Sequence, residues 1–115
     1  MDKNNLWRLS ASEIVKATTA GEIRSIDVIT SVIGRMRKVN PKLNAVVIDL
    51  SEQALKTAEL LDTDRANGKE CGPLHGVPIT IKINVDQKGQ STSNGVSALK
   101  NLIAPDDAPI VKNLK

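Results

Sequence analysis

The chain has 115 residues, the size of a single domain, and its one cysteine excludes an intrachain disulfide. Its net charge of +3 comes from 16 basic and 13 acidic residues that are interleaved, and Trp7 is the only aromatic residue. Base stacking needs aromatic side chains, so we expect no nucleic-acid partner. The sequence has no signal peptide and no apolar run near the ~20 residues of a membrane span, so we expect a cytoplasmic protein without membrane contact.

The first 43 residues predict two helices. Ser10 and Glu13 have the spacing of a capping box, which predicts a helix from there to Gly21. A second helix is predicted to begin at Ser25 and to end before Asn40-Pro41. Its apolar residues recur at helical spacing and form one stripe: Val28, Ile29, Val32, Ile33, Met36 and Val39.

Four basic residues gather toward the end of this second helix: Arg35, Arg37, Lys38 and Lys42. Cations near a helix C-terminus oppose the helix dipole favourably and commonly do no more than solvate the surface. We therefore interpret this stretch as a solvated face.

A short strand and a third helix are predicted next. Residues 44–49 are aliphatic and partly β-branched, which favours a buried strand. Ser51 is predicted to cap a helix that ends at Asn67-Gly68. Small and apolar residues give this helix a face for close packing: Ala54, Leu55, Ala58, Leu61 and Ala66.

From Val77 to Val85 the apolar residues alternate with polar ones, and Lys82 stands on the polar face. This pattern predicts a second strand, and Pro78 confines its start to a sheet edge or to a position that donates no ladder bond. A polar loop over residues 90–95, one or two helical turns over 96–102, and a last helix that starts at Asp106-Asp107-Ala108-Pro109 are expected to follow.

The order of these elements predicts the α/β class with a mixed or parallel sheet. Such a sheet needs more than two strands and needs cover on both faces. We therefore expect residues 1–115 to be an incomplete domain, with helices and one short strand over 1–70 and the lysine-bearing strand, loop and helix over 71–115. Self-association through the unfinished sheet is a further expectation.

Lys82 has two interpretations from the residues alone. A lysine on the polar face of an amphipathic strand is usually a solvated charge. A lysine base must instead be neutral, and since the ordinary lysine pKa is about 10.4, this requires burial, which lowers a lysine pKa by up to ~3–5 units. The strand pattern favours the solvated charge.

The run from Gly72 to Gly89 resembles the start of the amidase signature family. It carries Gly-Pro-Leu, a Gly-Val-Pro turn, an apolar stretch that leads to Lys82, and then Asn84, Asp86 and Gly89. Residues 40–45, Asn-Pro-Lys-Leu-Asn-Ala, and residues 106–111 also resemble the N-terminal region of the family, so the resemblance covers nearly the whole chain. One departure is Ile83, where the family usually has aspartate.

This resemblance implies the N-terminal portion of an amidase-signature mixed-sheet domain. It also implies a hydrolase of carbon–nitrogen bonds in small non-peptide amides, with no cofactor or metal. Lys82 matches the base of the family's Ser, cis-Ser, Lys triad, whose two serines lie in a Gly-Ser-rich segment absent from residues 1–115. Ser91 and Ser93 are interpreted as loop residues rather than substitutes for them.

His75 and Cys71 are weaker candidates. A metal site needs three or four ligands, and His75 is the only histidine, so we expect it to have a structural role in its turn. Cys71 has no plausible general base and is not expected to act as a nucleophile.

Two alternatives to the hydrolase stay open. A protein like the A-subunit of glutamyl-tRNA amidotransferase belongs to the same family and would use the same lysine. A catalytically inactive, truncated module would explain the absent serines and the unfinished sheet.

Overall fold

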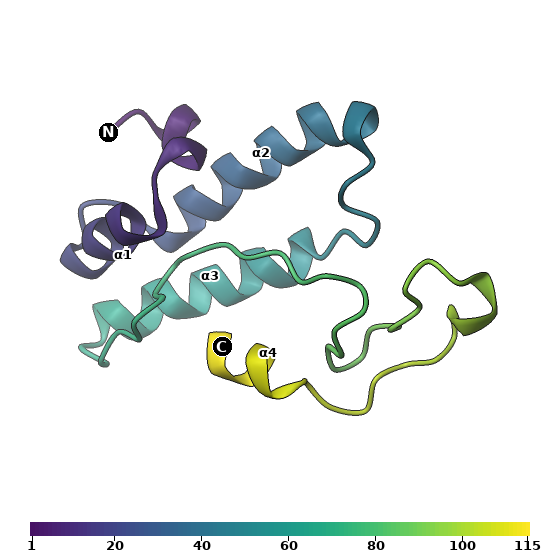
Figure 1. The fold of residues 1–115 in the computed structure, drawn as a ribbon. Coiled ribbons are helices and arrows are strands. Elements are labelled where there is room, and N and C mark those ends of the chain that lie inside the picture. Colours follow the sequence, from purple (N-terminus) through teal and green to yellow (C-terminus); the bar gives the residue numbers. More distant parts are fainter. The chain divides into compact units, whose positions relative to one another are not determined.

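The computed structural model describes residues 1–115. They form two compact units, residues 1–78 and residues 79–115. The first unit contains the 3-10 helix η1 (Lys3–Arg8) and the helices α1 (Ala11–Ala20), α2 (Ser25–Leu43) and α3 (Ser51–Ala66) (Figure 1). The second unit contains the short helices η2 (Ser97–Leu99) and α4 (Pro109–Leu114). None of these helices combines the length and the apolar character needed to cross a membrane.

The first long helix, α1, begins and ends where the sequence predicts. The Ser10 hydroxyl oxygen accepts a hydrogen bond from the Glu13 backbone N–H at 3.3 Å, and the Glu13 carboxylate accepts one from the Ser10 N–H at 2.7 Å. Gly21 ends the helix in the left-handed conformation with φ +76°, where glycine carries no steric penalty. The capping box is therefore confirmed.

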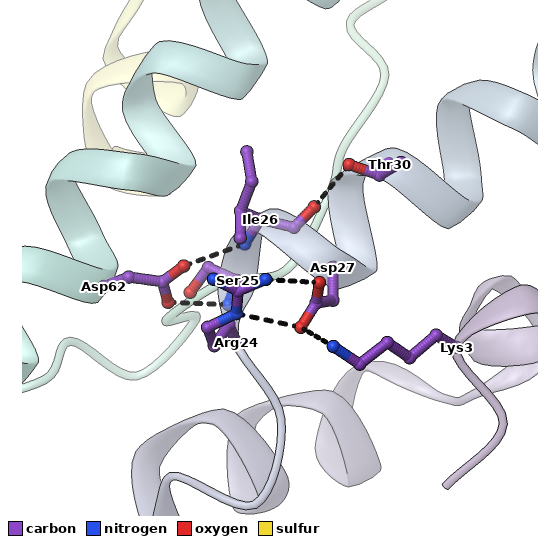
Figure 2. A network of polar contacts seen from close by, with 7 residues as sticks. All are labelled: Lys3, Arg24, Ser25, Ile26, Asp27, Thr30 and Asp62. Atoms are coloured by element: carbon purple, nitrogen blue, oxygen red, sulfur yellow. Dashed lines mark hydrogen bonds and ion pairs between the residues drawn. The ribbon is translucent and has the colours of Figure 1, made fainter.

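The first turn of α2 is capped by a residue of another helix. The side chain of Arg24, the N-cap residue of α2, accepts no hydrogen bond from this turn. Instead, the Asp62 carboxylate on α3 accepts from the backbone N–H of Ser25 at 2.7 Å and from that of Ile26 at 3.0 Å (Figure 2). Two of the four unpaired N–H groups of the α2 N-terminus are thus satisfied from α3.

A second carboxylate, Asp27, lies in the same turn. The Arg24 guanidinium donates two hydrogen bonds to it, at 2.8 and 3.0 Å, and the Lys3 ammonium of η1 lies 3.1 Å away (Figure 2). The hydrogen bonds from Arg24, assisted by Lys3, hold the pKa of Asp27 below its ordinary value of 3.8. A negative charge in the first turn also stabilises the helix dipole.

The apolar core of the first unit has two clusters, and α2 contributes residues to both. One joins η1, α1 and α2 and contains Leu6, Ile14, Ala17, Ile23 and Val28, with Leu9 and Val77 packed against it. The other fills the contact between α2 and α3, which lie side by side in Figure 1, and contains Ile29, Ile33 and Ala58. The predicted stripe on α2 is therefore shared between two neighbours, and the predicted small-residue face of α3 packs through Ala58.

The helix α2 extends further than predicted, because Asn40-Pro41 does not end it. Proline removes only its own N–H bond, and this loss is small in the last turn of a helix. Asn44 then ends the helix in the left-handed conformation and donates its N–H to the Asn40 carbonyl at 2.7 Å. The Asn40 side chain adds two hydrogen bonds to the backbone of Val46, both at 2.9 Å.

Neither predicted strand forms, so the structure is mostly helical and the expected mixed sheet is absent from residues 1–115. Residues 44–50 form a loop, in which Val47 is 68 % exposed. Asp49 in this loop accepts from the Ser51 N–H at 2.8 Å, so Ser51 is the first helical residue rather than the cap of α3. A strand exists only with a hydrogen-bonded neighbour, and this chain offers none to either segment.

The second unit is held by backbone pairing between residues 86–92 and 102–108. Gly89 donates to the Ala104 carbonyl at 3.0 Å, and Ala104 donates to the Gln90 carbonyl at 2.9 Å, next to a single antiparallel bridge between Ser91 and Ile103. The helical turn predicted in 96–102 appears as η2, and α4 begins at Pro109. Both predictions for this region are confirmed.

We predict that Asp62→Ala lowers the free energy of unfolding by roughly 2 kcal/mol, because two backbone N–H groups lose a charged acceptor. Asp62→Asn keeps one acceptor oxygen and is expected to cost less. The control is Asp64→Ala on the same helix, whose carboxylate pairs only with Lys69 at the surface and is worth below about 1 kcal/mol. Urea denaturation followed by circular dichroism measures all three, and equal losses for Asp62→Ala and Asp64→Ala would contradict the capping role.

The depressed pKa of Asp27 predicts a pH-dependent contribution to stability. This contribution is present above the ordinary value of 3.8 and is lost as the pH falls through the lower pKa of the folded state. Wild type should therefore exceed Asp27→Asn in free energy of unfolding at neutral pH, and the difference should shrink in acid. Urea denaturation of both proteins from neutral pH to below 3.8 provides the measurement. A difference in the free energy of unfolding that does not change with pH would rule out the ion pairs as its source.

Candidate active-site segment around Lys82

The turn that precedes Lys82 is fixed to α1. Within the turn, His75 donates its N–H to the Gly72 carbonyl at 3.1 Å and Val77 donates to the Leu74 carbonyl at 3.0 Å. The hydroxyl of Thr18, a residue only 1 % exposed, lies 2.9 Å from the His75 carbonyl oxygen and in position to donate to it. Val77 packs against the core cluster of η1, α1 and α2.

Gly76 brings the turn into direct contact with the N-terminus of α2. Its φ is +76°, and a Cβ atom at this position would lie 2.8 Å from Ser25 Oγ and 3.0 Å from Thr18 Cγ2. No other residue fits both the backbone angle and the space. His75 is 6 % exposed, and its Nε2 and the Ser25 hydroxyl are buried without a hydrogen-bond partner.

Lys82 lies in the second unit and is exposed. The alternation predicted from the sequence survives in the exposure of the side chains, since Ile81, Ile83 and Val85 are half-buried while Lys82 and its polar neighbours are exposed. The backbone nevertheless makes a turn here, with the Val85 N–H donating to the Lys82 carbonyl at 3.0 Å. The lysine ammonium takes part in none of the five ion pairs of the chain.

The structure brings no hydroxyl to Lys82 as a hydrogen-bond partner. Ser91 pairs with Ile103 in the antiparallel bridge, and the carbonyl of the buried Ser93 accepts from the Val96 N–H at 2.8 Å. Both serines therefore occupy structural positions in the loop. Cys71 is half-buried and free, and no three histidine, cysteine, aspartate or glutamate residues gather as a potential metal site.

Sequence reasoning singled out Lys82 but missed the residues that fix the segment before it. Thr18 and Ser25 have the pattern of ordinary helix residues, and they contact Gly76 although they lie 58 and 51 positions before it in the sequence. The one available signal was Gly76 itself, which follows a histidine in a run of turn-forming residues.

Comparison with known proteins identifies the family. A model of the Amidase family matches residues 27–115. An indoleacetamide hydrolase of Bradyrhizobium diazoefficiens is 52 % identical over 113 residues, which are 98 % of this chain and 22 % of that protein. The A-subunit of a glutamyl-tRNA(Gln) amidotransferase from Carboxydothermus hydrogenoformans is 39 % identical over 110 residues, which are 96 % of this chain and 23 % of that protein.

Solved structures agree with this result. A structure described as a vestigial protein complex that reveals the evolutionary origins of an s-triazine catabolic enzyme superposes with a TM-score of 0.86 and 26 % identity over 92 % of this chain and 23 % of that one. A bacterial aryl acylamidase of the amidase signature family superposes with a TM-score of 0.77 and 30 % identity over 84 % of this chain and 20 % of that one. The chain thus spans about a fifth to a quarter of the length of its relatives. Because the family match covers more than half of its residues, the chain belongs to the amidase signature family.

Proposed function

We propose that this chain is part of an enzyme that hydrolyses the carbon–nitrogen bond of a small non-peptide amide, with Lys82 as the general base. The observation that carries the proposal is the 52 % identity to an indoleacetamide hydrolase over almost the whole chain. The identity to the amidotransferase relative is lower, 39 %, which favours hydrolysis over amide transfer.

In the proposed reaction the neutral Lys82 amine takes a proton from a bridging serine, which takes the proton of a nucleophilic serine. The nucleophile forms an ester with the acyl carbon, the carbon–nitrogen bond breaks, and the amine leaves with a proton. Water then hydrolyses the ester by the same proton path in reverse. Ser91 and Ser93 are held in structural positions, so in this proposal both catalytic serines lie outside residues 1–115.

The proposal requires a covered Lys82, because a lysine is neutral near pH 7 only when it is desolvated. The unit that contains Lys82 exposes six large apolar side chains, which are suitable contacts for such a cover: Ile79, Val96, Leu99, Leu102, Ile103 and Ile110.

A hybrid enzyme tests the role of Lys82. In it, this chain replaces the matching 22 % of the Bradyrhizobium indoleacetamide hydrolase. We expect the hybrid to hydrolyse indoleacetamide, and we expect Lys82→Met to lower kcat by a factor of about 10² to 10⁴, the usual contribution of a general base.

The control is Lys100→Met, another exposed lysine of the same unit, which should change kcat less than about twofold. Thermal unfolding of each variant separates a catalytic loss from a folding defect. A Lys82→Met hybrid that unfolds like its parent and keeps full activity would remove Lys82 from the mechanism.

The second candidate, a non-enzymatic module, is supported by the same exposed apolar side chains. It predicts that residues 1–115 alone have no amidase activity and associate with one another, and that Leu102→Lys together with Ile103→Lys weakens this association. Analytical ultracentrifugation over a range of concentrations measures it. A concentration-independent monomer with a sharp thermal transition would contradict self-association.

A further inference from the structure

An open pocket of about 560 Å³ lies between η1 and α2, entirely within the first unit, whereas Lys82 belongs to the second. This volume is in the range of small-molecule sites, about 300–1,000 Å³. The side chains that matter for its chemistry come from both helices: Lys3, Trp7 and Arg8 on one side, and Ser31, Arg35 and Lys38 on the other.

The pocket concentrates positive charge. Four cations line it, together with a single carboxylate, Asp27, which is already engaged by Lys3 and by Arg24. Arg8, Arg35 and Lys38 form no ion pair. The charged side chains of the lining sum to +3, which equals the net charge of the whole chain, so the remaining charged residues balance one another.

Trp7 holds two of these cations in place. The guanidinium carbons of Arg8 and Arg35 each lie 4.5 Å from the centroid of its ring. Cation–π contact fixes the guanidinium planes without using their N–H groups, and neither side chain donates a hydrogen bond within the chain. Two like charges beside one ring repel each other, and a bound anion would relieve that repulsion.

Ser31 supplies one more donor. Its hydroxyl oxygen accepts from the Trp7 backbone N–H at 3.1 Å, which leaves its own proton free to donate into the pocket. The unpaired charged groups and this hydroxyl are therefore all donors, and the contacts with Trp7 fix Arg8, Arg35 and Ser31 before any ligand arrives. Preorganised guanidinium groups bind phosphate and carboxylate groups with two parallel hydrogen bonds each.

We propose that this pocket binds a small oxyanion with two or more negative charges, in which Arg8, Arg35 and Lys38 hold the phosphate or carboxylate groups. Nucleic acid fits less well, because the chain has a single aromatic ring for base stacking and two guanidinium groups already contact that ring. This inference does not depend on the role of Lys82.

The single tryptophan makes the proposal directly measurable, since Trp7 is the only aromatic residue of the chain. The full 115-residue chain is titrated with pyrophosphate and, separately, with citrate at constant ionic strength, and Trp7 fluorescence is recorded. We expect a saturable change with a Kd of about 1 mM or lower for at least one of them. Which anion binds more tightly distinguishes phosphate from carboxylate ligands.

Matched variants locate the site. Arg8→Gln with Arg35→Gln should weaken binding by about tenfold or more, because two charged donors are lost. The control, Arg37→Gln with Lys42→Gln, removes the same charge from α2 at residues outside the pocket lining and should change Kd by less than about twofold. Calorimetric titration of the same proteins gives Kd without relying on the tryptophan signal.

Several results would overturn the proposal: a non-saturating response, an equal loss of affinity in the control variant, or an oligonucleotide that binds the parent more tightly than either anion and loses affinity in the Arg8, Arg35 variant. If circular dichroism shows that the Arg8, Arg35 variant loses helix, Lys38→Gln replaces it, since Lys38 is exposed and lies outside both core clusters. If the free chain self-associates, the hybrid enzyme is used instead, and the rise in its unfolding temperature with each anion is compared between the parent and the variants.

Discussion

The first turn of α2 is the point at which the helical unit is tied together. Asp62 satisfies two backbone N–H groups there from α3, and Asp27 in the same turn joins Arg24 to Lys3 of η1. Ser25, the first residue of the turn, also touches the glycine of the turn that precedes Lys82. The backbone donors and ionic partners of these two carboxylates have fixed positions, so they add a directional restraint on α2 to its apolar packing.

Features that depend on neighbouring residues could be predicted from the sequence, whereas contacts between distant residues could not. The capping box of α1 involves residues three apart, and the start of α4 follows from a proline and its acidic neighbours, so both were confirmed. The cap of α2 comes from residue 62, 37 positions after Ser25, and no local pattern points to it. The same is true of Trp7, which appeared isolated and is in fact packed beside Arg35 of the stretch interpreted as a solvated face.

The two predicted strands show why periodicity is incomplete as a guide. Residues 81–86 do expose alternate side chains, as the sequence predicts, yet no ladder forms because a strand requires a second backbone. Likewise, Pro41 was expected to end α2, but it lies in the last turn of the helix, which runs on to Leu43. The role of Lys82 stays a prediction, carried by family membership rather than by its surroundings in residues 1–115.

Gly76 has a consequence for how this part of the chain can vary. Its left-handed backbone leaves no room for a side chain, since a Cβ atom at position 76 would lie 2.8 Å from Ser25 Oγ and 3.0 Å from Thr18 Cγ2, so the turn can approach the helix only while residues 18 and 25 stay small. A bulkier residue at position 25 would push the turn outward, and no substitution at position 76 could compensate, since glycine is already the smallest residue. Positions 18, 25 and 76 therefore form a linked set, and variation at any one of them alone shifts the chain that leads to Lys82.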